Sequence, residues 1–173
     1  YHMKVELGAK KDGTMTALSI KTIADHGYTN ASANPMKYPA GLFSICTGSY
    51  ALKNAFCEVD AVYTHKPPGG VAYRCSFRVT EAVHAIERMV DVLAQELKMD
   101  PADVRFKNFI PADKFPYKSA LGWEYDSGNY PAALKKAMDK IGYADLRKEQ
   151  AEKRKRGSMP GRMLWWHGRA ELP

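Results

Sequence analysis

The chain has 173 residues, of which 45% are hydrophobic and 26% are charged, a composition typical of a globular domain with a sizeable core. No run of about eighteen apolar residues occurs, so the sequence offers no candidate membrane-spanning helix. The net charge of +7 invites a nucleic-acid-binding interpretation, but residues 147–173 hold eight lysines or arginines against three glutamates, which places most of the surplus in the tail.

Alternating apolar and polar residues predict two strands near the start of the chain, over residues 4–10 and 14–24. The pair Asp12-Gly13 lies between them, and this dipeptide is typical of the turn in a β-hairpin. We therefore expect an antiparallel hairpin. Since a strand pattern is already present at Lys4 and the first residue is Tyr1, we also expect the sequence to be an internal piece of a longer protein.

After the hairpin, residues 28–41 are rich in Asn, Ala, Pro and Ser and predict a long surface excursion. Further strands are predicted over residues 43–47 and 57–64. The second of these carries an alternating pattern and leads into a loop that begins at Pro67.

The second half of the chain is predicted to be helical. Apolar residues at three- and four-residue spacing from Ala82 to Leu97, Val83 among them, predict a long amphipathic helix that begins near Thr80. Asp100-Pro101 is typical of a helix N-cap followed by proline at the first helical position. The remaining predictions are a short helix over 101–108, a mixed loop over 111–129, a helix over 131–141 capped by Gly142, and a charged helix over 145–156.

The loop before the long helix has an unusual composition, Pro67-Pro68-Gly69-Gly70 followed by Val-Ala-Tyr-Arg-Cys-Ser-Phe-Arg. The prolines stiffen its entry, and the glycines permit backbone conformations that other residues rarely adopt. Cys75 is a candidate thiolate, because Arg74, Arg78 and the N-terminus of the following helix all favour the anionic sulfur.

The three cysteines, at positions 46, 57 and 75, show none of the CxxC or Cys/His spacings of zinc sites. Their odd number argues against a disulfide framework, so reduced thiols in an intracellular protein are the simplest interpretation. Other residues of chemical interest are given ordinary roles: Cys46 and Cys57 as structural cysteines, His26 as a turn residue, His84 as a packed or edge histidine, and Trp123 and Tyr125 as side chains packed against helices.

The string from Gly69 to Arg78, followed by Thr80-Glu81-Ala82, closely resembles the active-site loop in the large subunits of molybdenum-copper carbon monoxide dehydrogenases. Those subunits belong to the xanthine dehydrogenase and aldehyde oxidase family of molybdenum hydroxylases. Most relatives that lack copper carry glycine or another small residue at the position of Cys75. The resemblance covers roughly residues 1–157 and is also carried by the segments 8–13, 24–27, 107–109 and 121–130.

The resemblance implies an α/β fold, a partial molybdopterin-binding domain of mixed strands packed against amphipathic helices. Residues 1–157 would form this region, with strands in 1–66, the active-site loop in 67–79 and helices in 80–157. From Ser158 the sequence departs from the family pattern, so residues 158–173 are expected to be a divergent tail that need not be native.

The resemblance also assigns roles in the loop. Cys75 would bind Cu(I), whose second ligand is a sulfide shared with molybdenum, and a soft thiolate suits this ion. Arg74 would supply positive charge near the metal oxo group, and Phe77 would wall off a small apolar pocket, which makes these two the implied catalytic residues. The implied contacts with the molybdenum cofactor come from Gly69, Gly70, Val71, Ala72, Tyr73, Arg74 and Ser76.

The implied activity is the oxidation of carbon monoxide with water to carbon dioxide at a molybdenum-copper centre. The implied cofactors are molybdenum-molybdopterin cytosine dinucleotide and Cu(I), with FAD and [2Fe-2S] clusters in a medium and a small partner subunit that receive two electrons. The assembly would be a cytoplasmic dimer of heterotrimers, with the inner face of the membrane as a second location. Because the family's catalytic glutamate lies outside this sequence, we expect the chain alone to be inactive.

Two alternatives stay open at this stage. The same fold could serve a molybdenum hydroxylase of aldehydes or N-heterocycles without copper, in which Cys75 is incidental; copper content separates the two. The second alternative is a small basic nucleic-acid-binding module that uses residues 147–169, which would bind in a salt-dependent manner.

Overall fold

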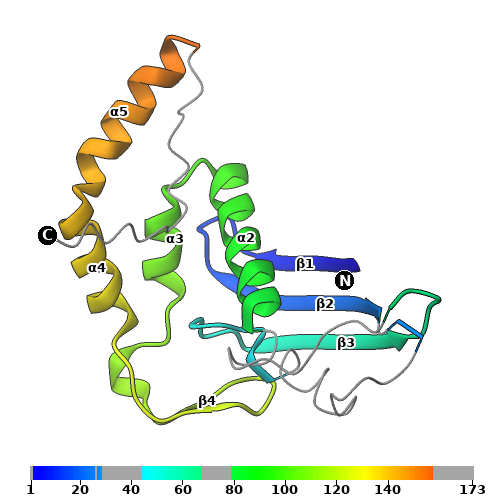
Figure 1. Cartoon of the computed structure of the whole chain (residues 1–173). Coiled ribbons are helices and arrows are strands. Elements are labelled where there is room, and N and C mark those ends of the chain that lie inside the picture. The colour runs from blue at the N-terminus through cyan, green and yellow to red at the C-terminus, as the bar shows by residue number, and fades with distance from the viewer. Residues whose placement is uncertain (1, 26, 29–43, 68–78, 158–173) are drawn as a thin grey trace, which may run out of the picture. The chain divides into compact units, whose positions relative to one another are not determined.

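The structure, a computed structural model, describes residues 2–25, 27–28, 44–67 and 79–157. Its Cα positions divide the chain into two compact units, Tyr1–Pro131 and Ala132–Pro173. The first unit contains the three-stranded sheet and the helices α2 and α3 (Figure 1).

The sheet has the strand order β1-β2-β3. β1 (His2–Ala9) pairs antiparallel with β2 (Met15–Asp25), so the predicted hairpin is confirmed. Its turn is closed by the Lys10 amide, which donates to the Thr14 carbonyl at 2.8 Å. β2 then pairs in parallel with β3 (Asn54–Val62), a strand that begins and ends earlier than the sequence pattern predicted.

The predicted strand over residues 43–47 is wrong for the part that the structure describes. Residues 44–45 are helical and residues 46–49 form a turn. Gly48 has a φ of +57°, and its amide donates to the Ile45 carbonyl at 3.0 Å. The turn thus bonds partly to itself and partly to distant residues, since the Ile110 amide donates to the Ser49 carbonyl at 3.0 Å.

Helix α2 (Val79–Leu97) packs against the sheet, as its apolar stripe predicted. Its buried residues are small or β-branched and recur at three- and four-residue spacing: Ala82, Ala85, Ile86, Val90 and Ala94. They share one core cluster with Leu18 and Ile20 of β2 and Cys57 of β3. Val83, which the pattern placed in the stripe, is 43% exposed because it lies at the margin of this narrow buried row.

Helix α3 (Pro101–Asn108) begins as predicted, with the Asp100 carboxylate accepting a hydrogen bond from the Ala102 amide at 2.8 Å. Asn108 at its end is buried and holds the β1-β2 hairpin. Its Oδ1 accepts from the Met15 amide at 2.8 Å, and its Nδ2 donates to the carbonyls of Gly13 at 2.9 Å and Val104 at 2.7 Å. One side chain therefore joins helix α3 to the start of β2.

The predicted mixed loop contains a short 3-10 helix, Ala112–Lys114, and a two-stranded ribbon of β4 (Tyr117–Lys118) and β5 (Glu124–Tyr125). The Tyr125 hydroxyl donates to the Gly48 carbonyl at 2.8 Å, so the ribbon is held to the turn at residues 46–49. Trp123, which was predicted to pack against helices, precedes β5 and is 46% exposed.

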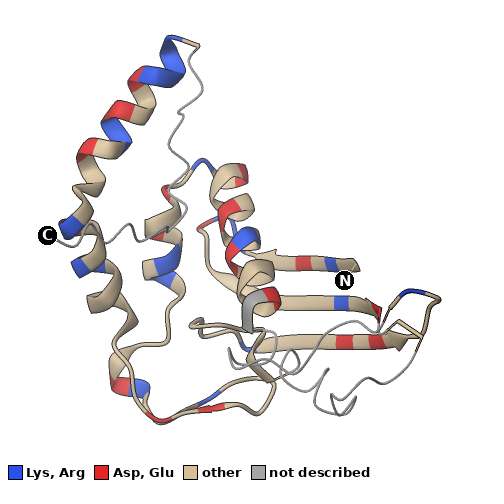
Figure 2. Cartoon of the chain, viewed as in Figure 1, with Lys and Arg blue, Asp and Glu red and all other residues tan. Residues whose placement is uncertain are grey.

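Helix α4 (Tyr130–Ile141) and helix α5 (Tyr143–Lys155) confirm the last two predicted helices, and Gly142 between them has a φ of +64°. Basic and acidic residues alternate along α5 (Figure 2). They pair three or four residues apart: Lys148 with Asp145 at 3.0 Å, Lys155 with Glu152 at 2.9 Å, and Lys153 with Glu149. The basic run of this helix is thus partly neutralised on the helix itself.

We predict that Asn108→Ala lowers the free energy of unfolding by about 2–4 kcal/mol, because it leaves the Met15 amide and the Gly13 carbonyl without their buried partner. Asn54→Ala is the matched control. Asn54 is an exposed asparagine that donates a single hydrogen bond to the Thr16 carbonyl at 3.1 Å, and its loss should cost less than about 1 kcal/mol. Urea unfolding of parent and variants measures both values, and equal losses would contradict the role given to Asn108.

Candidate functional site

The predicted site residues from Gly69 to Phe77 lie outside the described residues, as does His26. The structure does describe the two ends of the chain that bracket this loop. The chain enters it after Pro67, five residues beyond the end of β3, and leaves it at Val79, the first residue of α2. The contacts of these two ends therefore define where the loop begins and where it ends.

The entry to the loop lies at the carboxyl edge of the parallel strands. Since β2 and β3 run in the same direction, both strands end at the same edge, which is where ligands commonly bind in parallel sheets. Beyond the strands the two segments that follow β2 and β3 stay paired. The Thr64 amide donates to the Gly27 carbonyl at 2.9 Å, and the Tyr28 amide donates to the Lys66 carbonyl at 3.0 Å. The segment leading into the loop is thus held by the segment that follows β2.

Asp25, the last residue of β2, joins these two segments through its carboxylate. Its Oδ1 accepts from the Gly27 amide at 2.9 Å and from the Thr64 hydroxyl at 2.7 Å, and its Oδ2 pairs with the Lys66 ammonium at 3.0 Å. We call these four residues, Asp25, Gly27, Thr64 and Lys66, the Asp25 latch. Sequence reasoning missed it because Asp25 and Thr64 are 39 positions apart.

Within the latch, Gly27 occupies a position that only glycine can adopt without strain. Its φ is +73°, and a Cβ built on it would stand 2.2 Å from the Pro67 carbonyl oxygen. The glycine therefore allows the backbone of residues 66–67 to pass directly over it.

The latch also fixes the charge of its carboxylate. The hydrogen bond from the Gly27 amide, followed by those from Thr64 and Lys66, lowers the pKa of Asp25 to about 2 from its ordinary value of 3.8. The Lys66 side chain is 76% exposed and that of Asp25 27% exposed, so their ion pair contributes little to stability. The main effect of the Asp25 carboxylate is to hold Thr64 and Lys66 next to Gly27.

The other end of the loop continues into α2, and a partly buried cluster of polar side chains holds this helix. Glu87 of α2 accepts from the Tyr50 hydroxyl at 2.7 Å and from Arg105 Nε at 2.9 Å, while Arg105 also pairs with Asp91 at 3.0 Å. The Tyr50 ring stacks on Phe109 with centroids 5.5 Å apart. Burial and the Glu87 carboxylate raise the pKa of Tyr50, so its hydroxyl stays a donor.

Cys46 and Cys57 are both buried free thiols in the core, which agrees with the structural role expected for them. The hydrogen bond with Cys57 and the burial of the side chain raise the pKa of Cys46.

His84 is exposed on α2, at the edge of the apolar stripe. Within the part of the chain that the structure describes, no group of three or more His, Cys, Asp or Glu residues could hold a metal ion.

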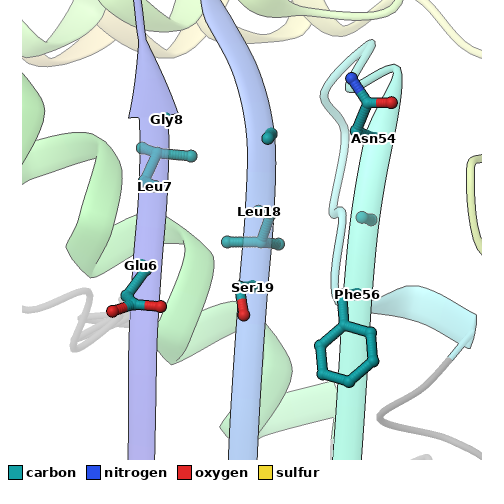
Figure 3. Close-up of a pocket in the computed structure, with 9 residues that line it drawn as sticks. Glu6, Leu7, Gly8, Leu18, Ser19, Asn54 and Phe56 are labelled. Carbon is teal, nitrogen blue, oxygen red and sulfur yellow. The ribbon is translucent and has the colours of Figure 1, made fainter.

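A shallow hollow of about 500 Å³ lies on the face of the sheet away from α2 (Figure 3). Small residues of β1 and β2, Gly8 and Ala17, line it together with Ser19 and Phe56, whose ring is 50% exposed. Sequence reasoning missed this hollow, because small residues at facing positions of two strands leave no periodic signal.

No helix among the described residues has the length and apolar character needed to cross a membrane.

Comparisons with known proteins agree with the resemblance to molybdenum hydroxylases. Residues 1–109 match the family model described as molybdopterin cofactor-binding domain. The carbon monoxide dehydrogenase large chain of Afipia carboxidovorans is 61% identical over 153 residues, which are 88% of this chain and 19% of that relative.

Solved structures give the same result. A crystal structure of the Cu,Mo-CO dehydrogenase in its carbon monoxide reduced state matches with 59% identity and a TM-score of 0.83, covering 91% of this chain and 20% of that chain. Quinoline 2-oxidoreductase from Pseudomonas putida 86 matches with a TM-score of 0.78 but only 28% identity, over 90% of this chain and 20% of that chain. The chain thus spans about one fifth of the length of the proteins it matches.

We predict that Gly27→Ala destabilises the protein more than Gly122→Ala. Gly122 has a similar φ, +84°, but a Cβ on it would meet nothing within 4 Å, so it isolates the cost of the left-handed backbone. That cost should be about 1 kcal/mol, whereas Gly27→Ala adds the clash with Pro67 and should cost at least about 3 kcal/mol. Urea unfolding measures both, and similar losses would contradict the close passage over Gly27.

The lowered pKa of Asp25 predicts how the latch responds to pH. Because the pKa in the folded protein lies below the ordinary value of 3.8, the stabilisation is fully present above that value and is lost as pH falls toward about 2. The difference in unfolding free energy between the parent and Asp25→Asn should thus stay constant from about pH 7 to 5 and shrink below about pH 4. A difference that already shrinks between about pH 7 and 6 would contradict this assignment.

Proposed function

The chain belongs to the molybdopterin cofactor-binding domain family, and from this premise we propose that it is part of the large subunit of an aerobic molybdenum-copper carbon monoxide dehydrogenase. The enzyme would oxidise carbon monoxide with water to carbon dioxide. The observation that carries the proposal is the gap in identity between two structures of the same fold: 59% with the Cu,Mo-CO dehydrogenase and 28% with the quinoline oxidoreductase.

The chemistry of the available donor fits the copper ion that the proposal requires. Cu(I) is a soft ion that prefers thiolate ligands, and Cys75 is a thiol flanked by Arg74 and Ser76, with Arg78 close behind in the sequence. The other two cysteines are buried in the core. Cys75 is therefore the residue that we propose as the copper ligand.

When bound, the molybdenum-copper centre supplies a soft site for carbon monoxide and an acceptor for its two electrons. The chain's own residues would prepare that site. Arg74 would add positive charge beside the metal oxo group, and Phe77 would exclude water, which strengthens electrostatic interactions there. Gly69, Gly70, Val71, Ala72, Tyr73 and Ser76 would complete the contacts with the molybdenum cofactor.

The finer assignments belong to the same proposal. The molybdenum cofactor would be the cytosine dinucleotide form, and a medium subunit with FAD and a small subunit with [2Fe-2S] clusters would accept the electrons in a cytoplasmic dimer of heterotrimers. Residues 1–157 would be the part contributed to the cofactor-binding region, with 158–173 as a divergent tail. Neither alternative is favoured: a copper-free hydroxylase leaves the gap in identity unexplained, and a nucleic-acid module would use a helix whose basic side chains are partly paired with acidic ones.

The proposal predicts the metal content of the complete enzyme assembled with its partner subunits. The parent should contain about one copper per molybdenum, and Cys75→Ser should lose copper and carbon monoxide oxidation together, because a hydroxyl is a poor ligand for Cu(I). Cys57→Ala removes a buried thiol and should keep the copper. Elemental analysis measures the ratio, and molybdenum without copper in the parent would overturn the proposal in favour of a copper-free hydroxylase.

A further inference from the structure

The helices α4 and α5 have no buried residue between them. They are 12 and 13 residues long, and every one of their described side chains is exposed or half-buried. Isolated helices of this length are marginal in water, because helices in proteins gain most of their stability from packing an apolar face. Each of the two helices therefore needs a source of stability beyond its own backbone hydrogen bonds.

Helix α5 has such a source on its own surface. Its acidic and basic side chains pair three or four residues apart, as in Lys148 with Asp145 at 3.0 Å and Lys155 with Glu152 at 2.9 Å. Pairs at this spacing stabilise a helix whose residues are mostly polar. The exposure of α5 is thus consistent with a helix that stays in solvent.

Helix α4 has a different character. Leu134, Ala137, Met138 and Ile141 recur at three- and four-residue spacing, and we call these four residues the α4 stripe. Leu134 and Met138 are half-buried, whereas Ala137 and Ile141 are exposed, Ile141 to 47%. The helix therefore has a clear apolar side that is not covered as a core helix would be.

The apolar stripe of α2 shows the outcome of this pattern when a partner surface is present. Ala82, Ile86 and Val90 are at most 1% exposed, because they share one core cluster with the sheet. The α4 stripe has the same spacing, but none of its residues is buried in the part of the chain that the structure describes. An apolar stripe of this kind typically marks contact with a further surface.

The length of the relatives indicates what covers the α4 stripe. This chain spans 19% of the carbon monoxide dehydrogenase large chain of Afipia carboxidovorans and 20% of the matching Cu,Mo-CO dehydrogenase chain. A subunit of that length would have most of its residues outside this structure.

Charge gives a second indication. Helix α4 carries three lysines against one aspartate, and Lys135 and Lys140 lie on the two sides of the stripe when residues are placed about 100° apart around the helix. The surface that fits the α4 stripe is thus apolar at its centre and acidic at its margin.

We propose that the α4 stripe is a docking surface for another segment of the same large subunit, one that lies outside these 173 residues and presents an apolar surface bordered by acidic side chains. This inference rests on the proposed function, since it takes the chain as part of a large subunit. It goes beyond it by assigning an internal contact of the subunit to α4 and leaving α5 in solvent.

Amide hydrogen exchange in the complete, partner-assembled enzyme tests the difference between the two helices. After correction for intrinsic rates, we expect the amides of α4 to exchange at least about 10-fold more slowly than those of α5, because a packed helix opens less often than an exposed one. This measurement needs no substitution, so it does not depend on whether a variant folds.

Photo-crosslinking in the same assembled enzyme identifies the occupant. A p-benzoylphenylalanine in place of Met138 places the crosslinker in the stripe, and one in place of Lys136 places it on the polar side of the same helix. We expect position 138 to crosslink to a large-subunit peptide from outside residues 1–173, identified by mass spectrometry. Position 136 should give a much lower yield.

Three results would overturn the inference. A crosslink from position 138 to the medium or small subunit, or to a second copy of the large subunit, would show a different occupant. A crosslink to a peptide within residues 1–173, or equal yields from positions 138 and 136, would show that the stripe does not dock on the rest of the subunit. Exchange in α4 as fast as in α5 would show that the stripe is uncovered.

The proposed function is tested separately by the metal content of the parent enzyme. Molybdenum without copper would overturn that function, whereas the crosslink from position 138 concerns the large subunit of either kind of molybdenum hydroxylase.

Discussion

The parallel pairing of β2 with β3 is the constraint on which the rest of the first unit depends. Two neighbouring parallel strands cannot be joined by a tight turn, so the chain must cross from the end of β2 to the start of β3 through residues 26–53. The same pairing places the ends of both strands at one edge. Everything that defines the entry to the candidate loop follows from this: the extended ladder, the latch, and the passage of Pro67 over Gly27.

Polar side chains with several hydrogen bonds add to the apolar core in determining how the helices sit on this sheet. Asn108 ties the end of α3 to the hairpin, and Glu87 ties α2 to Tyr50 and Arg105. Asn108 is buried and would be costly to leave unpaired, and Glu87 is partly buried, so both restrict the arrangement of the elements that they join. The two ends of the loop over residues 68–78 are thus attached to elements with little freedom to shift.

Local patterns in the sequence predicted the elements whose stability is local. The stripe from Ala82 to Leu97 and the cap at Asp100-Pro101 were sufficient for α2 and α3. The segment at residues 44–47 was predicted wrongly, because its conformation depends on the positive φ of Gly48.

Long-range contacts could not be predicted from the sequence. Asn108 bonds to Met15 across 93 positions, and no periodic pattern indicates such a contact. The site residues of the loop came from family resemblance, whereas the latch that holds its entry came only from the structure.

The burial of Cys46 and Cys57 has a consequence for the order in which such a protein matures. An unfolded chain offers three thiols to a soft metal ion. Folding removes two of them from competition, since Cys46 and Cys57 are both buried in the core. A copper ion that arrives before folding can be captured by the wrong sulfur and obstruct the core, whereas one that arrives afterwards cannot reach it. For the proposed copper enzyme, the packing of the sheet against α2 thus favours folding first and metal insertion second.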